Sequence, residues 1–146
     1  MKVLVVNGPN LNMLGIREKS VYGVNTYEDL VRHIYSVCSE NNLECEVFQS
    51  NSEGALIDKI QSAYGVFDGI IINAGGYSHT SIAIMDALKA VLMPCVEVHL
   101  SDISKREEFR RFTYTSLACI RSFIGGGFDS YTEAVKFLAE YFKNEA

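Results

Sequence analysis

The sequence has 146 residues, 48% of them hydrophobic, and a net charge of −5. This length predicts one domain, residues 1–146, that buries about 68–70% of the surface exposed by the unfolded chain. The acidic balance, with no run of Lys or Arg, argues against nucleic acid or a membrane as partner.

The chain opens directly into a predicted strand, without the charged and apolar regions of a signal peptide. No apolar run approaches the roughly eighteen residues that a membrane span needs. We therefore expect a cytoplasmic protein. Its cysteines stand singly, without CxxC spacing or a nearby His, which favours buried free thiols over disulfides or metal ligands; they are Cys38, Cys45, Cys95 and Cys119.

The first predicted strand, Val3–Val6, is continuously apolar, as in a strand covered on both faces of a parallel sheet. It runs into a turn rich in asparagine and glycine, residues 7–12, at the end of a strand where α/β sheets bind ligands. The loop over residues 15–23 is long and carries Arg17 and Tyr22. Either it is a lid that closes over a substrate, or these two side chains merely pack on the surface.

Further elements follow in steps of about thirty residues. Thr26 and Asp29 predict the start of a helix that stops near Asn41. The later patterns predict, in order, an edge strand over 43–49, a helix over 56–63, a buried strand over 69–73, a helix over 82–92, a strand over 95–100, a last strand over 118–124 that Arg121 interrupts, and a terminal helix capped by Ser130. This alternation predicts an α/β fold with a doubly wound parallel sheet of five strands.

Polar groups collect where the predicted strands end, which places them on one rim of the sheet. Loops that could fold over this rim supply cations and a phenol. The candidates are Asn7, Asn10, Asn73 to His79, His99 and Ser101 at strand ends, with Arg17, Tyr22 and Arg110 in loops.

Several reaction classes lack their residues. There is no GxxxxGK[ST] phosphate loop, no GxSxG nucleophile elbow and no Ser/Thr-rich turn for a flavin phosphate. Asparagines stand where a phosphoacceptor domain would hold Mg²⁺ with aspartates. Acid–base chemistry without metal or covalent intermediate remains.

Tyrosine, with a pKa of about 10, is a poor base unless cations lower that value. Arg17 and Arg110 could do so for Tyr22, while a histidine protonates a leaving hydroxyl. Asparagines and backbone amides could stabilise an enolate. The residues thus predict proton abstraction beside a carbonyl with loss of water.

Four long motifs, in order and spacing, resemble those of the type II 3-dehydroquinate dehydratases over nearly the whole chain. They are NGPNLNMLGIR followed by Tyr22 and Gly23, QSNSEG, NAGGYSHTSIAIMDAL and EVHLSDISKREEFR. The resemblance implies a flavodoxin-like sheet with strand order 2-1-3-4-5. It also implies elimination of water from 3-dehydroquinate to 3-dehydroshikimate in the shikimate pathway, without metal, Schiff base or other cofactor.

The resemblance assigns a role to each matching position. Tyr22 is the general base, Arg17 its activating lid residue and Asn10 the stabiliser of the enolate, acting with a water. His99 is the general acid, oriented by Glu97. The implied substrate contacts are Asn73, Gly75, His79, Leu100, Ser101 and Arg110, with Asp86 reaching a neighbouring subunit of a dodecamer built of trimers.

Three positions depart from the family pattern. Asp102 stands where the family usually has Asn, so we expect a change in local affinity or loop packing. Arg121 and Ser130 replace usual glycines, where we expect effects on packing or subunit contacts. The alternative function is a non-catalytic flavodoxin-like module that binds a small molecule, and a further one is a metal-dependent dehydratase on the same fold.

Overall fold

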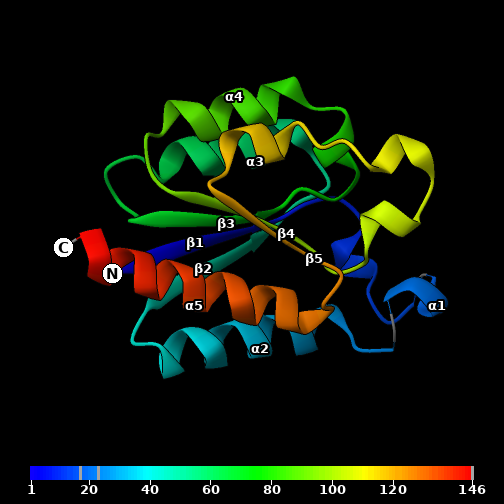
Figure 1. Ribbon diagram of the computed structural model, residues 1–146, viewed down its shortest axis with the longest axis horizontal. Helices are drawn as coiled ribbons and strands as arrows, with labels where there is room; N and C mark the ends of the chain where they lie inside the picture. Colours follow the sequence, from blue (N-terminus) through cyan, green and yellow to red (C-terminus); the bar gives the residue numbers. More distant parts are fainter. Residues whose placement is uncertain (17, 23, 146) are drawn as a thin grey trace.

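A five-stranded parallel sheet, in the order β2-β1-β3-β4-β5, forms the centre of the computed structural model (Figure 1). The structure describes residues 1–16, 18–22 and 24–145, without the side chains of Lys19 and Tyr22. The strands are β1 (Lys2–Asn7), β2 (Glu44–Gln49), β3 (Gly69–Asn73), β4 (Cys95–His99) and β5 (Arg121–Ile124). The predicted α/β fold and strand order are confirmed.

Helices cover both faces of the sheet. Figure 1 shows α3 (Glu53–Ser62) and α4 (Ile82–Ala90) on one face, and α2 (Tyr27–Glu40) and α5 (Phe128–Glu145) on the other. Successive residues of β1 serve opposite faces: Val3 and Val5 pack with α2 and α5, and Leu4 with α3 and α4. This burial on both faces explains the unbroken apolar runs of the central strands.

Polar caps fix where the helices begin. Thr26 accepts from the backbone N–H of Asp29, whose carboxylate accepts from the N–H of Thr26, so the predicted start of α2 is confirmed as a capping box. Ser52 caps α3 in the same way through the N–H of Ala55. These caps satisfy N–H groups that a helix start leaves without partners.

The predicted end of α4 and the predicted start of β5 are wrong. Helix α4 ends at Ala90, short of Leu92, whose φ of 55° is left-handed and cannot continue a helix. Ala118 belongs to a 3₁₀ turn, so β5 begins only at Arg121. The guanidinium of Arg121 lies over the ring of Phe123, 5.2 Å from its centroid, which accommodates a cation in this edge strand.

Ser130 is not the N-cap of the terminal helix. Helix α5 begins two residues earlier, at Phe128, and Ser130 lies buried in its first turn. Its Oγ accepts a hydrogen bond of 2.9 Å from the N–H of Gly126, so the hydroxyl satisfies a backbone donor just before the helix.

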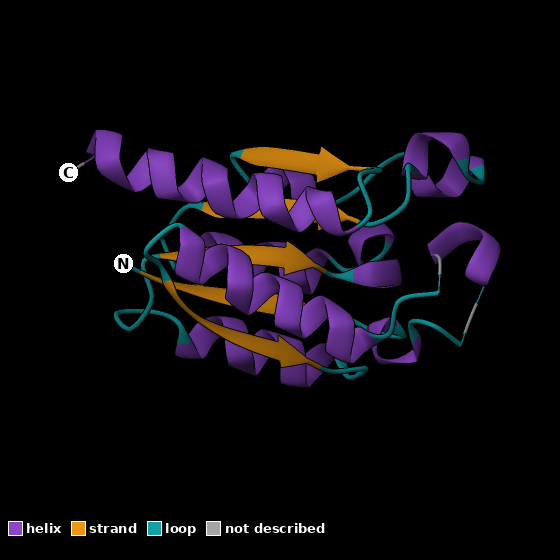
Figure 2. Ribbon diagram, turned by 90° about the horizontal axis from the view of Figure 1, so that it is seen from below, coloured by secondary structure: helices purple, strands orange, loops and turns teal. Residues whose placement is uncertain are grey.

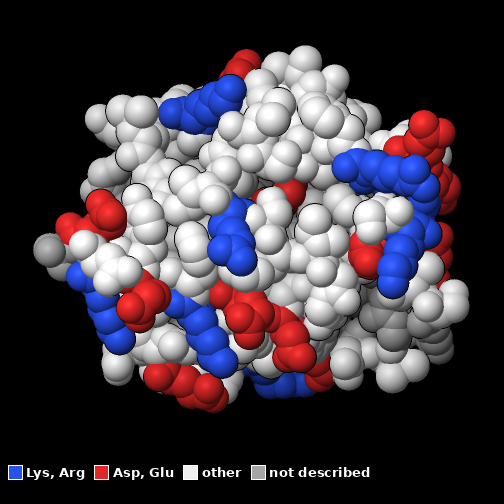
Figure 3. Space-filling view, in the orientation of Figure 1, with Lys and Arg blue, Asp and Glu red and all other residues white. Residues whose placement is uncertain are grey.

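The strands all point to one end of the molecule, where short helical segments gather (Figure 2). They include α1 (Lys19–Tyr22), in the loop predicted as a lid, and the 3₁₀ turns Gly75–His79, Ile103–Lys105 and Glu108–Arg110, which follow β3 and β4. None of the helices in the described ranges could cross a membrane. On the face shown in Figure 3, basic and acidic side chains are interspersed rather than gathered by sign.

Candidate active site

Strand register brings the predicted site together at the carboxyl edge of the sheet. Asn7 of β1 pairs with Asn73 of β3, and Ile72 pairs with Glu97 of β4. A pocket of about 140 Å³ opens beyond these ends. Most of the predicted site residues line it: Asn10, Asn73, Gly75, His79, His99, Leu100, Ser101 and Arg110.

The remaining predicted residues lie elsewhere or outside the description. Asp86 is exposed on α4 and does not line this pocket, so its reach to a neighbouring subunit stays a prediction. Glu97 lies beneath the pocket, behind His99. Arg17 and the side chain of Tyr22 lie outside the described residues, and their predicted pairing is not tested here.

Two glycines let the loops after β1 and β3 pack against each other. A Cβ on Gly8 would lie 2.4 Å from the carbonyl oxygen of Ala74, which is impossible without backbone movement. Gly75 has a φ of +59°, and a Cβ there would lie 3.0 Å from the carbonyl oxygen of Pro9. Only glycine fits either position.

The QSNSEG segment braces the first turn. The amide of Gln49 donates to the carbonyl oxygen of Gly8 at 3.1 Å, and the side-chain oxygen of Asn51 accepts from the N–H of Asn10 at 3.0 Å. Asn10 itself is left-handed, with φ 72°, a conformation that asparagine tolerates. These contacts fix the backbone from which Asn10 enters the pocket.

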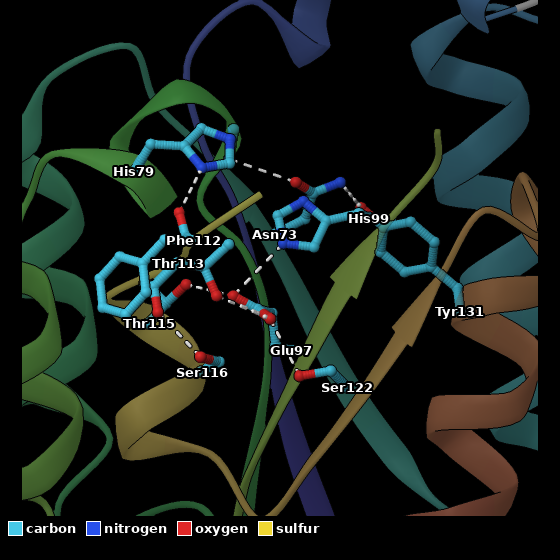
Figure 4. A network of polar contacts seen from close by, with 11 residues as sticks. Asn73, His79, Glu97, His99, Phe112, Thr113, Thr115, Ser116, Ser122 and Tyr131 are labelled. Atoms are coloured by element: carbon cyan, nitrogen blue, oxygen red, sulfur yellow. Dashed lines mark hydrogen bonds and ion pairs between the residues drawn. The ribbon is translucent and has the colours of Figure 1, made fainter. Parts of the chain in front are cut away.

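Glu97 and His99 form a buried pair on alternate positions of β4. Both are almost inaccessible, at 1% and 5% exposure. The Nε2 of His99 lies 3.3 Å from Oε2 of Glu97, an ion-pair distance, although the two atoms are not aligned as a hydrogen bond. The predicted orientation of His99 by Glu97 is consistent with this contact (Figure 4).

Three hydroxyls surround the carboxylate of Glu97. Thr113 and Ser122 donate to Oε1, at 3.3 and 2.9 Å. Thr115 donates to Oε2. Figure 4 shows them arriving from the segment after the pocket loops and from β5. None of the three hydroxyls was predicted, because single hydroxyl residues follow no periodic pattern in the sequence.

These contacts keep Glu97 ionised. Burial raises the pKa of its carboxyl, but His99, with hydrogen bonds from Thr115 and Ser122, outweighs that effect and holds the pKa below its ordinary value. The ionised carboxylate of Glu97 lies next to Nε2 of His99. Its negative charge therefore favours the form of the ring that carries a proton on that nitrogen. The other ring nitrogen, Nδ1, is then the one that can serve a ligand.

Glu97→Gln should change how stability depends on pH. A depressed pKa in the folded state stabilises the fold fully above the unfolded value of about 4.3, and this contribution is lost as pH falls through the lower folded value. We expect the variant to be less stable than the wild type by about 1–3 kcal/mol near neutral pH, with the difference narrowing in acid.

Urea unfolding between pH 3 and 7 measures this difference, with the exposed Glu140→Gln of α5 as matched control. The control should follow the wild type throughout. A gap between Glu97→Gln and wild type that stays constant with pH would show that Glu97 is not held ionised by its neighbours.

His79 lies beside His99 at the pocket wall. Their rings are stacked, with centroids 6.2 Å apart. Nδ1 of His79 lies 2.9 Å from the carbonyl oxygen of Phe112, and because a carbonyl only accepts, this nitrogen carries the proton. Burial lowers the pKa of His79, with smaller contributions from His99 and Arg110, so the ring is neutral and presents Nε2 as an acceptor.

Among the described residues, the pocket is lined by the predicted Arg110 and by Arg106, which was not predicted. Nε of Arg110 donates to Glu107 at 2.7 Å, which orients a side chain that is only 25% exposed. Arg106, which the sequence analysis missed, also lines the pocket and lies 3.7 Å from Glu18 in the loop predicted as a lid. Their charges suit an anionic ligand.

Asp102 does not line the pocket. Its carboxylate caps the turn at Ile103–Lys105, accepting from the backbone N–H of Ser104 at 3.1 Å. The carboxylate thus takes part in the packing of this loop, and the change in local affinity or loop packing relative to the family's Asn stays a prediction. Elsewhere, no group of three His, Cys, Asp or Glu side chains in the described ranges is arranged to hold a metal ion, and the four cysteines are free.

Comparison with known proteins places this geometry among related chains. Residues 1–139 match the model of the family described as dehydroquinase class II. A 3-dehydroquinate dehydratase of Fusobacterium nucleatum subsp. nucleatum is 54% identical over 145 residues, covering 97% of this chain and 99% of the relative. One of Clostridium acetobutylicum is 52% identical, covering 94% and 96%. The crystal structure of type II dehydroquinase from Butyrivibrio crossotus matches with a TM-score of 0.92 and 51% identity, covering 94% of this chain and 97% of that one.

Proposed function

The chain belongs to the class II dehydroquinase family, and from that premise we propose which of its residues carry the reaction. Membership makes it an enzyme, a hydro-lyase that removes water from 3-dehydroquinate to give 3-dehydroshikimate. The residue roles below are supported by the arrangement of the pocket. The observation that carries them is the buried Glu97–His99 pair opening onto a pocket lined by amides and arginines.

Tyr22 begins the reaction as the base. Its phenolate removes the proton from the carbon beside the substrate carbonyl, and the electron pair moves onto the carbonyl oxygen to give an enolate. Arg17, five positions earlier on the same loop, lowers the pKa of the phenol by its positive charge. Asn10, at the pocket wall, stabilises the enolate oxygen with a bound water.

His99 completes the elimination as the acid. The enolate collapses to a conjugated enone, the carbon–oxygen bond of the hydroxyl breaks, and the protonated ring gives its proton to the departing oxygen as water leaves. Glu97 stabilises the imidazolium before that transfer, because its carboxylate lies 3.3 Å from Nε2. Solvent then returns the proton from Tyr22 to His99.

Substrate binding falls to the rest of the pocket wall. Arg110 attracts the substrate carboxylate, together with the backbone at Leu100 and Ser101. Asn73 and His79 meet its hydroxyl groups as a donor and an acceptor. Asp86 reaches the site of a neighbouring subunit in a dodecamer built of trimers. The whole chain serves as one catalytic domain, in the cytoplasm and in the shikimate pathway.

Ultraviolet absorbance of the enone on addition of 3-dehydroquinate tests this function. The band should grow at a rate proportional to protein concentration, and neither a chelator nor borohydride should reduce that rate, because the proposed route uses no metal and no imine. A protein that binds 3-dehydroquinate without producing the band would be a binding module, and the proposal would fail.

A further inference from the structure

A buried tyrosine of the terminal helix reaches the pocket from behind. Tyr131 lies on α5, is 0% exposed, and directs its hydroxyl toward Asn73 (Figure 4). Asn7, at the end of the neighbouring strand, meets the same hydroxyl. Oη of Tyr131 lies 2.7 Å from Oδ1 of Asn7 and 3.0 Å from Nδ2 of Asn73.

These side chains are linked in a row of hydrogen bonds, and one backbone donor at the end of the row fixes the direction of each bond. The N–H of Gly75 can only donate, and it lies 3.2 Å from Asn73, so the atom it meets is the amide oxygen of that side chain. Nδ2 of Asn73 therefore faces Tyr131 and donates to its hydroxyl oxygen. The hydroxyl proton is then free to go to Oδ1 of Asn7, whose Nδ2 in turn faces the hydroxyl of Tyr27 at 3.4 Å.

The hydroxyl of Tyr131 keeps its proton at neutral pH. Burial raises its pKa above the ordinary value, more than the hydrogen bond from Asn73 lowers it. A neutral phenol has one proton to give, and Tyr131 gives it to Asn7. Hydrogen bonds aligned in one direction polarise and strengthen one another in a buried site.

We propose that Tyr131 is a positioning residue for the reaction, whose hydroxyl holds the amide of Asn73 so that its second N–H points into the pocket toward a substrate oxygen. Asn73 lines the pocket, and with its oxygen held by Gly75 and one N–H held by Tyr131, a single donor remains. The inference rests on the substrate-binding role of Asn73 proposed above.

Tyr131→Phe removes this clamp together with the hydrogen bond that the hydroxyl donates to Asn7. The ring still fills its site, but the amide of Asn73 keeps only its bond to Gly75 and can rotate away from the bound substrate. We expect KM to rise about tenfold, the value of one typical hydrogen bond, while kcat changes little. Tyr27→Phe is the matched control, since it removes a hydroxyl from the far end of the same row of hydrogen bonds without touching Asn73.

A double-mutant cycle with Asn73→Ala separates positioning from a general effect on structure. If Tyr131 acts through Asn73, Tyr131→Phe adds nothing to KM once Asn73 is alanine. If it still raises KM tenfold there, or if Asn73→Ala alone leaves KM unchanged, the inference is wrong. Should Tyr131→Phe fail to fold, Asn7→Ala enters the same cycle. It removes the acceptor of the hydroxyl proton and so loosens Tyr131, and we expect a smaller rise in KM that is likewise absent once Asn73 is alanine.

Activity of the wild type distinguishes this failure from failure of the proposed function. A wild type that produces the enone, combined with additive effects in the cycle, overturns only the role of Tyr131. A wild type that produces no enone overturns the function and this inference together.

Discussion

Tyr22→Phe is expected to lower kcat by a factor of about 10² to 10⁴, the usual contribution of a positioned general base. The substitution deletes only the phenol oxygen, and the proposed mechanism gives the described residues of the pocket wall other tasks than removing this proton. Nε2 of His79 meets a substrate hydroxyl in the proposed binding mode, and Glu97 is buried beneath His99. Enone absorbance under saturating substrate measures kcat directly.

Tyr64→Phe is the matched control for this variant. Tyr64 is 64% exposed and follows α3, at the end of the sheet away from the pocket, so its loss should leave kcat unchanged. Circular dichroism should show the same fold for both variants. Near-normal turnover by Tyr22→Phe would assign the base to another group.

His99→Ala is expected to divide the two halves of the reaction. Without its acid the enolate cannot release hydroxide easily, so enone formation should slow by a factor of about 10² to 10⁴. Removal of the α-proton uses Tyr22 and should slow much less. Proton NMR in D₂O follows both events in one sample, as loss of the α-proton signal and growth of the enone signal.

His33→Gln is the matched control for His99→Ala. His33 lies on α2 and contacts Thr132 of α5 at 2.7 Å, away from the pocket, so His33→Gln should leave both rates near the wild-type values. Equal slowing of exchange and elimination in His99→Ala would contradict a separate acid.

Much of the fold can be predicted from short stretches of the sequence. The apolar runs Val3–Val6 and Gly69–Ile72 could only be strands buried on both faces, and both are. The cap at Thr26 is likewise a contact between residues three apart. The errors have mixed causes. Arg121 in β5 also lies over the distant ring of Phe137, whereas the start of α5 follows from a turn in which Ser130 accepts from Gly126, and the end of α4 from the left-handed backbone of Leu92.

The residues of the pocket also fall into those that could be placed from the sequence and those that could not. Residues that follow a strand, such as Asn73 and His99, could be placed on the rim from sequence because parallel strands end at one edge. Their supporting partners could not. Tyr131 reaches Asn73 across 58 positions, and Thr115 reaches Glu97 from an irregular turn, so only packing in three dimensions brings them together.

Ionisation of Tyr22 tests the central claim most directly, because the mechanism needs a phenolate near neutral pH. The absorbance of ionised phenol should be measured against pH for wild type and Tyr22→Phe, each saturated with an unreactive carboxylate analogue of the substrate. We predict a difference band that titrates well below the ordinary tyrosine pKa of about 10 and returns toward it in Arg17→Ala. A difference band that appears only near pH 10 in the wild type would contradict the account.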